Sequence, residues 1–558
     1  MKKRYGFRQD SQGTTPRSLR RDMGQSGRFR ESEPYKNPGG SNKRQGFGSG
    51  MNGMTARIGS TFEAWVESFL EERGLPGLAV AMTESGRDVY ARGFGWSDRE
   101  GGLPVTEDTL FGIGSITKSF TAAALMQLCE EGRMEIDAPV SRYVPELGEV
   151  FGERAEATTA LHMLTHSTGM PPLPYLSVAM RDSLFADPDA QDDLQALDAA
   201  LGVRWVNTPV ELAEVLGRVS FPWLGAPGEV FSYSNDSYGL LGLLVERVSG
   251  LPYETYVRRR LLEPAGLRRS AFTPDEASRM GNCATLYRRR PVVKKADPDR
   301  PPGREGELGE AVPSPVWHEA PAMTAAGFLK MSARDLARAF NLYVSGGWVN
   351  GVRLLSEEST ERMCQARVRI TPTLGYGLGL NRSTDRGLTL IQHGGGLKGV
   401  SAFAVAIPEL DMTIAVLIHL GDEPASRVGM ALLNTVLGLD PDASAPLPET
   451  GPLPAAAHAL QGTYFDGESL SDVRFSWTQQ GELLLMGPEG ESPETVRWVG
   501  DGDFLAGEGR QVSWIRPVRE GDHVTAVRVG MRTHPRRKRW EEAGFPLPVP
   551  ERRKGQGS

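Results

Sequence analysis

Two apolar runs in the second half of the chain have the length and composition of buried β-strands. Residues 401–408 read Ser-Ala-Phe-Ala-Val-Ala-Ile-Pro and residues 412–418 read Met-Thr-Ile-Ala-Val-Leu-Ile. Because both runs are almost entirely apolar and their connection is short, they predict an antiparallel hairpin that is covered on both faces. A second hairpin is predicted from the apolar run 78–82 and the segment 87–96, with a Glu-Ser-Gly turn between them.

Helical spacing of apolar residues appears elsewhere, over 61–73, 116–131 and 238–245. Residues 135–320 alternate short helical stretches with loops, which predicts an α region of about that extent over a cleft. Its last part, 284–321, is polar and rich in Pro, as lids and binding rims often are. Because helices and strands from about 322 to 440 return to the sheet, we expect an α/β domain that is discontinuous in sequence.

The ends of the chain differ from this central part. Residues 441–456 contain a Pro-, Ala- and Ser-rich linker, after which 457–545 contain short alternating strands that predict a small antiparallel β-barrel or sandwich. Residues 1–55 are Gly- and Arg-rich, and the first 54 residues contain 12 Lys and Arg against 4 Asp and Glu. This N-terminal tail and a short C-terminal tail, 546–558, are predicted to be disordered.

The composition limits the cellular compartment and the binding partners that we expect for the protein. With 558 residues, 39% hydrophobic and 24% charged, the chain is expected to hold more than one domain, and it has no apolar run long enough to cross a membrane. No apolar leader follows any of the early methionines, and three widely spaced cysteines suit a reducing compartment, so we expect a cytoplasmic protein. No nucleic-acid partner is expected, although the basic tail could contact one.

One lysine stands out chemically. Lys118 is the only lysine between Lys43 and Lys294, a stretch that contains 22 arginines. Arg stays protonated, whereas a buried Lys can lose its proton and act as a base. Ser115 precedes it by three residues, so in a helix over 116–131 the two would share a face at the N-terminus. Ser115 is therefore a candidate nucleophile and Lys118 its candidate base, although an N-cap serine followed by a surface lysine has the same short pattern.

Two further segments place polar groups beside apolar elements. Tyr233 and Asn235 lie in a loop before the helical run 238–245, where a phenol can transfer a proton and an amide can orient a carbonyl. Residues 393–396, His-Gly-Gly-Gly, precede the first strand of the buried hairpin. Glycines on an edge strand let a substrate approach closely and leave backbone N–H groups free to bind an oxyanion.

Motifs of other enzyme classes are missing from the sequence. It contains no Gly-x-Ser-x-Gly pentapeptide, no Gly-Lys dipeptide and no Cys-x-x-Cys pair. These absences exclude an α/β-hydrolase nucleophile elbow, a P-loop and a cysteine-pair zinc site. The eight histidines are scattered, so we expect no metal ion and no cofactor.

Together these segments resemble the serine β-lactamase and penicillin-binding-protein superfamily, in its class C β-lactamase-like branch. That branch includes D-Ala-D-Ala carboxypeptidases, D-aminopeptidases and esterases. The resemblance runs from about Phe62 to about Leu439 and also covers 161–169 and 322–336. It implies the β-lactamase/transpeptidase-like fold over 56–440, an antiparallel sheet flanked by helices, with an all-α part. The segment 457–545 is similar to the lipocalin-like domain of some relatives.

The resemblance also implies a role for each motif residue. Ser115 would be the acylated nucleophile, Lys118 its proton acceptor, and Tyr233 the group that passes the proton to the leaving group or activates the deacylating water. The substrate-binding residues would be Asn235, which holds the substrate carbonyl, and His393, Gly394 and Gly395, which occupy the family's Lys-Thr-Gly position. The oxyanion hole would consist of the backbone N–H groups of Ser115 and Gly396.

The third motif departs from the family pattern. Efficient β-lactamases carry Lys-Thr-Gly, whose cation and hydroxyl help bind the substrate carboxylate, whereas His393 is expected to titrate near neutrality and Gly394 has no hydroxyl. Lys398 could replace the charge in part, or simply be solvated. We therefore expect a peptidase, amidase or esterase that acts through an acyl-enzyme on a small-molecule or short peptide substrate, and that could form homo-oligomers. The alternative is a catalytically weak scaffold that serves assembly or binding.

Overall fold

The computed structural model describes residues 58–547, except for 192–194, 196, 199–200, 202–205, 291–307, 422, 488–491 and 509–510. The predicted tail 1–55, most of the predicted tail 546–558 and the centre of the Pro-rich segment 284–321 therefore lie outside the described residues. By their contacts, residues Asn52–Ser558 form one unit, to which all the elements below belong.

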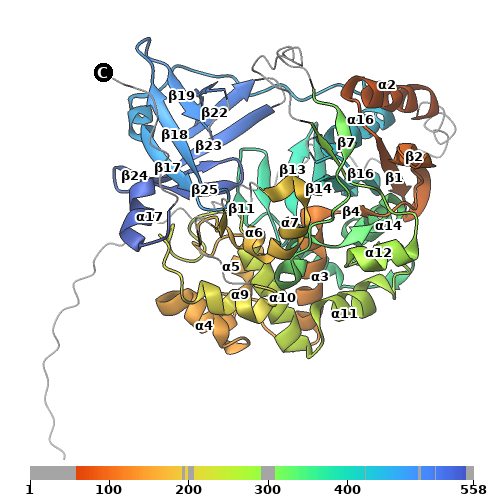
Figure 1. The fold of residues 1–558 in the computed structure, drawn as a ribbon, viewed down its shortest axis with the longest axis horizontal. Helices are drawn as coiled ribbons and strands as arrows, with labels where there is room; N and C mark the ends of the chain where they lie inside the picture. Colours follow the sequence, from red (N-terminus) through yellow and green to blue (C-terminus); the bar gives the residue numbers. More distant parts are fainter. Residues whose placement is uncertain are drawn as a thin grey trace, which may run out of the picture. The chain divides into compact units, whose positions relative to one another are not determined.

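The centre of this unit is a nine-stranded antiparallel sheet (Figure 1). In this sheet β16, which is the last strand along the chain, lies beside β1, which is the first. The sheet is therefore assembled from segments more than 300 residues apart, as predicted for a discontinuous domain. In order across the sheet, the strands are β11 (Val368–Arg369), β12 (Leu374–Tyr376), β13 (Asn381–Asp385), β14 (Leu388–Leu397), β15 (Val400–Ile407), β16 (Met412–Ile418), β1 (Gly77–Glu84), β2 (Arg87–Asp98) and β3 (Leu103–Pro104).

Both predicted hairpins are confirmed. Strands β15 and β16 pair antiparallel, every residue in them is buried, and the chain turns between them through Asp411 at a φ of 49°. Strands β1 and β2 are joined by Ser85 and Gly86, whose φ angles of 51° and 72° lie in the left-handed region. Buried antiparallel strands with short left-handed turns follow directly from continuous apolar runs broken by turn residues.

The two faces of the central strands carry side chains of different size. Large residues such as Val80 and Val405 pack under α2 (Glu63–Arg73) and α16 (Ala425–Val436). On the opposite face, alanines such as Ala79 pack in one cluster with α3 (Thr117–Glu130) and α14 (Ala333–Phe340). Because alanine side chains are short, α14 can approach β1 and β16 closely, and the turn Gly114–Ile116 that precedes α3 lies against β14.

The predicted helix over 116–131 is confirmed as α3, which a 3₁₀ turn, η3 (Gly114–Ile116), precedes. The described parts of 135–320 contain short helices, several of which pack against α10 (Asn235–Ser249), which is buried over most of its length (Figure 1). These helices are α4 (Glu146–Phe151), α5 (Ala160–Leu164), α6 (Tyr175–Ala179), α7 (Arg181–Ala186), α9 (Pro209–Leu216), α10 (Asn235–Ser249), α11 (Tyr253–Val257) and α12 (Pro274–Met280). Smaller elements follow: β4 (Phe111–Gly112), β5 (Ser270–Ala271), β6 (Tyr287–Arg289), β7 (Ala311–Pro313), α13 (Thr324–Gly327), β8 (Lys330–Met331), β9 (Trp348–Val349), β10 (Val352–Arg353) and α15 (Glu357–Cys364).

The prediction of a closed C-terminal barrel was wrong. Among the described strands, β17 to β20 form one sheet and β21 to β25 form another, and their apolar side chains share one core. The chain passes between the sheets at Val496, and their opposite edges meet at a single bridge between Tyr464 and Arg536, which is too little pairing to close a barrel. The elements are β17 (Gly462–Asp466), β18 (Ser471–Trp477), β19 (Leu483–Met486), β20 (Glu494–Thr495), β21 (Arg497–Gly500), β22 (Asp503–Glu508), β23 (Gln511–Glu520), β24 (His523–Val529), β25 (Arg532–Pro535) and α17 (Arg537–Ala543).

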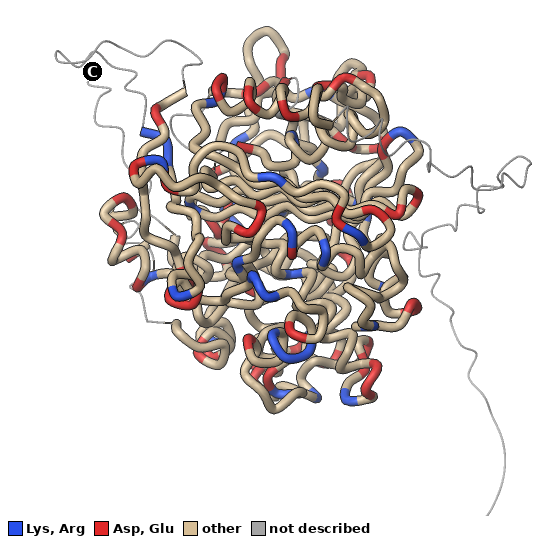
Figure 2. The backbone as a smooth tube through the Cα atoms, turned by 90° about the vertical axis from the view of Figure 1, so that its right-hand side faces the viewer, with Lys and Arg blue, Asp and Glu red and all other residues tan. Residues whose placement is uncertain are grey.

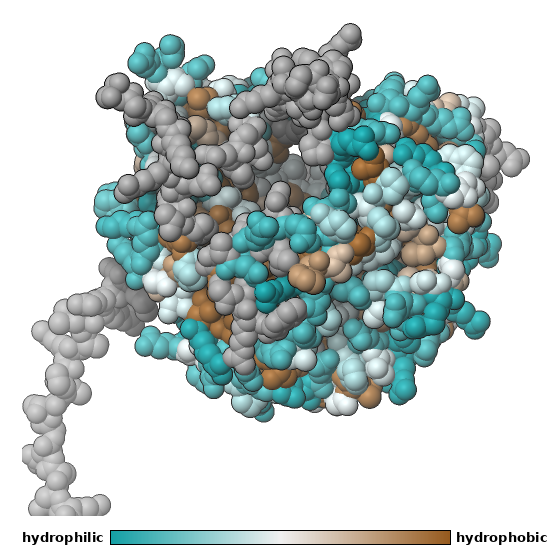
Figure 3. Space-filling view, in the orientation of Figure 1, coloured by the Kyte–Doolittle hydropathy of each residue, from teal (hydrophilic) through white to brown (hydrophobic). Residues whose placement is uncertain are grey.

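The surface is of mixed character. Acidic and basic residues are interspersed along the chain in Figure 2, and the apolar residues on the face drawn in Figure 3 form small, separate patches. Cys129, Cys283 and Cys364 all lie in the described part and are free thiols. Among the described helices, none combines the length and the apolar character needed to cross a bilayer.

Candidate active site

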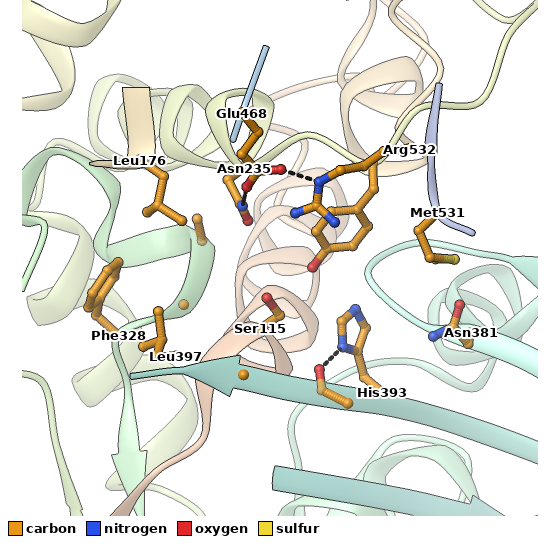
Figure 4. A pocket seen from close by; sticks show the side chains of 15 residues that line it. Ser115, Leu176, Asn235, Phe328, Asn381, His393, Leu397, Glu468, Met531 and Arg532 are labelled. Carbon is orange, nitrogen blue, oxygen red and sulfur yellow. Dashed lines mark hydrogen bonds and ion pairs between the residues drawn. The ribbon is translucent and has the colours of Figure 1, made fainter. Parts of the chain in front are cut away.

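Ser115 lies in a pocket of about 410 Å³ at the junction of η3, the start of α10, strand β14 and the C-terminal sheets (Figure 4). On one side of Ser115 the labelled side chains are apolar, namely Leu176, Phe328 and Leu397. On the other side are Asn381, His393, Met531 and Arg532. The pocket therefore contains the candidate nucleophile between an apolar wall and a polar wall.

Lys118 is completely buried one helical turn after Ser115. Its Nζ lies 3.2 Å from Ser115 Oγ, 2.8 Å from Asn235 Oδ1 and 2.6 Å from the carbonyl oxygen of Ala326. Helical spacing alone brings the lysine onto the face of the serine, and α10 and α13 supply the two other acceptors. The prediction that Ser115 and Lys118 are neighbours on one face is confirmed, and the interpretation of Lys118 as a surface lysine is wrong.

The environment of Lys118 favours the neutral amine. Burial lowers the pKa of Lys118 well below its ordinary value, and the positive charge of Arg532 lowers this pKa further, against the opposing effects of Glu468 and Asp236. In the neutral form, the two N–H groups of the amine can donate to Asn235 and Ala326, and the lone pair then faces Ser115 Oγ. In this neutral form Lys118 can accept the hydroxyl proton of Ser115.

Tyr233 is positioned to supply a proton. The phenol is buried, which raises the pKa of Tyr233, and a hydrogen bond with Ser115 offsets only part of that rise. The Lys118 Nζ lies 4.8 Å from the centre of the Tyr233 ring. Because Tyr233 keeps its proton at neutral pH, it suits the role of an acid that protonates a leaving group.

The expectation that His393 titrates near neutrality was wrong. Its side chain is 3% exposed, and burial lowers the pKa of His393 to about 4. Its Nε2 lies 3.1 Å from the Tyr376 hydroxyl, which is also 3.2 Å from His166 Nε2, and the backbone N–H of Ser234 donates to His166 Nδ1 over 3.1 Å. These hydrogen bonds have one consistent set of proton positions in which both imidazoles are neutral. In that set Tyr376 donates to His393 Nε2, and His393 Nδ1 donates to the Gly394 carbonyl.

The glycines of the third motif lie on a strand edge that is free on one side. Strand β14 pairs with β13 only as far as Gln392, whereas its pairing with β15 continues to Leu397. Residues 393–397 therefore have no neighbouring strand on the pocket side among the described residues. A Cβ atom on Gly395 would lie 1.9 Å from the Ile113 carbonyl oxygen, so this glycine lets η3 and β14 approach closely.

This close approach gives a matched pair of variants. Gly395→Ala is expected to lower turnover at least 10-fold, because the added methyl must push η3 away from β14 and so displace the two segments that would form the oxyanion hole. Gly148→Ala is the control, since Gly148 lies in α4 outside the pocket, its Cβ would meet nothing closer than the Ser141 Cβ at 3.9 Å, and the variant should keep most of the activity. Ester turnover of both variants, beside their melting temperatures, measures this difference. Equal activities would contradict the assigned role of Gly395.

The C-terminal sheets contribute residues that sequence reasoning missed. Glu468, in the turn between β17 and β18, accepts a 2.8 Å hydrogen bond from Asn235 Nδ2 and pairs with Arg532 at the start of β25. The backbone N–H of Tyr233 donates to the Met531 carbonyl oxygen over 2.9 Å. The amide of Asn235 joins Lys118 to Glu468 and also lines the pocket, and its role in holding the substrate carbonyl stays a prediction. No local motif marks Glu468 or Arg532, since their role depends on contacts between distant parts of the chain.

Lys398 is neither a solvated lysine nor a replacement for the missing cation. Its amine pairs with the buried carboxylate of Asp187, to which His318 Nε2 also binds at 2.8 Å. These contacts connect the β14–β15 turn to the segments at 187 and 318. Among the described residues, no group of three or more His, Cys, Asp or Glu side chains is arranged to hold a metal ion.

Comparison with known proteins identifies the family of the chain that carries these active-site residues. The Beta-lactamase family model matches residues 62–437. Esterase EstB of Burkholderia gladioli is 31% identical over 226 residues, which span 40% of this chain and 54% of the esterase. Penicillin-binding protein 4 of Amycolatopsis lactamdurans is 26% identical over 414 residues, or 72% of this chain and 96% of that protein.

Structural similarity extends beyond the matched region. The octameric penicillin-binding protein homologue from Pyrococcus abyssi superimposes with a TM-score of 0.56 at 26% identity, covering 85% of this chain and 98% of the homologue. That share is larger than residues 62–437 can supply, so it includes part of the C-terminal sheets. The large antiparallel sheet with its flanking helices is the β-lactamase/transpeptidase-like fold that the sequence predicted. With its family model matched over most of the length, the chain belongs to the beta-lactamase family of serine hydrolases.

Proposed function

We propose that this protein hydrolyses a small amide, peptide or ester through an acyl-enzyme on Ser115. The observation that carries the proposal is the completely buried Lys118, whose amine lies 3.2 Å from Ser115 Oγ and is held by two carbonyl acceptors. Burial lowers the pKa of this amine, and its neutral form can act as a base. This geometry also argues against a catalytically weak scaffold, which would not need a buried lysine at this place.

The geometry supports a two-step reaction. Ser115 Oγ attacks the substrate carbonyl while Lys118 takes the hydroxyl proton, and the backbone N–H groups of Ser115 and Gly396 hold the negative charge on the carbonyl oxygen. Tyr233 then gives its proton to the leaving nitrogen or oxygen as the bond to the carbonyl carbon breaks. In the second step, water attacks the acyl-enzyme and the same groups run the proton transfers in reverse.

The strand edge at the third motif favours linear acyl compounds over β-lactams. The family's Lys-Thr-Gly position holds a neutral imidazole and a glycine, so the strand edge provides no cation and no hydroxyl for a β-lactam carboxylate. Losing a charge-assisted hydrogen bond costs about 1.5–3 kcal/mol, or roughly 10- to 150-fold in rate or affinity. The names of the relatives, an esterase and a penicillin-binding protein, are consistent with ester or amide chemistry.

Fluorophosphonate labelling followed by peptide mapping tests the nucleophile, and a substrate panel tests the class. We expect one label per chain, on Ser115, and faster turnover of p-nitrophenyl esters or amino-acid amides than of nitrocefin. The absence of a label would favour the scaffold alternative. A label on another serine, or nitrocefin as the best substrate, would contradict the proposal. We also propose self-association, which the octamer named for the Pyrococcus abyssi homologue supports.

A further inference from the structure

Arg532 enters the active-site pocket from the C-terminal sheets, at the first residue of β25. Its Nε–H donates to Glu468 Oε2, and its guanidinium carbon lies 5.3 Å from the centre of the Tyr233 ring. Glu468 is itself held on its other oxygen by Asn235. The carboxylate of Glu468 therefore fixes the guanidinium by its Nε side (Figure 4), and the guanidinium lies over the ring of Tyr233.

The other end of the guanidinium is available to a ligand. In the described part of the chain, Nη1 and Nη2 of Arg532 have no hydrogen-bond acceptor, although the residue lines the pocket. Both oxygens of Glu468 are already engaged, so Glu468 cannot turn to bind these groups without releasing Asn235. A planar pair of N–H donors on a fixed arginine matches the two oxygens of a carboxylate, which accepts two parallel hydrogen bonds.

The position of Arg532 identifies which part of the substrate it would meet. The apolar side chains Leu176, Phe328 and Leu397 lie on the opposite side of Ser115, where they suit an apolar acyl group (Figure 4). Arg532 lies over Tyr233, which protonates the departing nitrogen or oxygen. A group bound by Arg532 therefore belongs to the leaving portion of the substrate.

We propose that Arg532 binds a carboxylate on the leaving group, so that the preferred substrates are acylated amino acids or hydroxy acids with a free carboxylate. This inference rests on the proposed serine-hydrolase function. In acylation the Ser115 Oγ–carbonyl bond forms, the bond to the leaving nitrogen or oxygen breaks, and the proton from Tyr233 completes the free amino acid or hydroxy acid. Arg532 thus supplies, from the C-terminal sheets, a cation that the strand edge at His393 does not provide.

A matched pair of esters tests the inference directly. Both carry a phenylacetyl group, and the leaving group is glycolic acid in one ester and the uncharged glycolamide in the other. The wild-type chain is expected to prefer the glycolic acid ester in kcat/KM. In Arg532→Gln this preference should fall roughly 10- to 150-fold, beyond any loss that both esters share, because the charge-assisted hydrogen bonds are lost.

Three comparisons make the test decisive. Arg474→Gln is the control, because Arg474 lies on β18 of the same C-terminal sheets, half exposed and outside the pocket, and it should leave the preference unchanged. Arg532→Lys keeps the charge without the planar donors and should restore only part of the preference. The double variant Glu468→Gln and Arg532→Gln leaves no unpaired charge in the pocket and should show the same loss of preference as Arg532→Gln.

The possible failures are distinguishable. If the wild-type chain hydrolyses neither ester and Ser115 takes no fluorophosphonate label, the proposed function fails. If it hydrolyses the glycolamide ester with Ser115 labelled, but shows no preference for the carboxylate or keeps that preference in Arg532→Gln and the double variant, the function stands and the inference about Arg532 is overturned. Equal losses for both esters in these variants would likewise overturn it, since they would indicate a positioning role alone.

Discussion

Ser115→Ala is expected to lower ester turnover by roughly 10³- to 10⁶-fold and to abolish fluorophosphonate labelling. Catalytic groups that act as a unit cannot be removed singly without losing most of the rate enhancement. The side chain of Ser115 is only partly buried and its Oγ contacts other members of the site, so the fold should persist. Single-turnover kinetics, intact-protein mass after labelling and the melting temperature measure these three outcomes.

Ser119→Ala provides the matched control for this experiment. Ser119 lies one turn further along α3, is buried, and its Oγ donates to the Ile116 carbonyl over 2.8 Å. Removing that hydrogen bond should cost about 1 kcal/mol of folding stability and leave the label in place. Normal labelling of the Ser115 variant, or loss of labelling only in the Ser119 variant, would disprove the assigned nucleophile.

Lys118→Arg is expected to be nearly as inactive as Lys118→Ala, with a loss of roughly 10³-fold or more. A guanidinium stays protonated, so it cannot accept the proton of Ser115 even though it keeps the positive charge. In the wild-type enzyme, kcat/KM should fall as the pH decreases through the pKa of Lys118, because protonation removes the base. Since burial lowers this pKa well below its ordinary value, that loss lies on the acid side of the profile and not near pH 10.

A second buried lysine serves as a control that distinguishes the loss of the candidate base from the cost of packing an arginine in place of a buried lysine. Lys330 is 2% exposed, its amine donates to the Phe272 carbonyl over 3.0 Å, and it does not line the pocket. Lys330→Arg imposes a similar packing cost, so comparing the melting temperatures of the two arginine variants shows how much of the Lys118 effect is structural. Substantial turnover by Lys118→Arg would mean that Lys118 acts only through its charge.

Much of the fold could be predicted because its signals are local. The continuous apolar runs at 401–407 and 412–418 are buried strands whose short turn leaves only an antiparallel pairing, and the structure has that hairpin. The three-residue spacing of Ser115 and Lys118 likewise places both on one helix face whatever surrounds them. The barrel was not predictable in the same way, because alternating strands indicate a sheet but not whether its edges meet.

The titration of His393 shows why a motif residue can be found while its behaviour is misjudged. An imidazole in a sequence has an ordinary pKa near neutrality, but here the loss of solvent lowers the pKa of His393 to about 4. The positive charge of Lys118 adds to this effect, and the bond to the Gly394 carbonyl opposes it. Burial depends on every element that covers a side chain. It is therefore a property of the assembled molecule, which the residue and its neighbours in sequence do not report.

The sequence by itself determined the family and indicated the candidate nucleophile and its candidate base, since these rest on short spacings and on motifs in a set order. Only the tertiary structure decided what surrounds them. It brings Glu468 to Asn235 across 233 residues of chain and places the open end of Arg532 over Tyr233. The physical reason is that contacts between distant segments and the removal of water arise only when the sheets pack together, and these two effects decide which charged groups line the pocket and how they titrate.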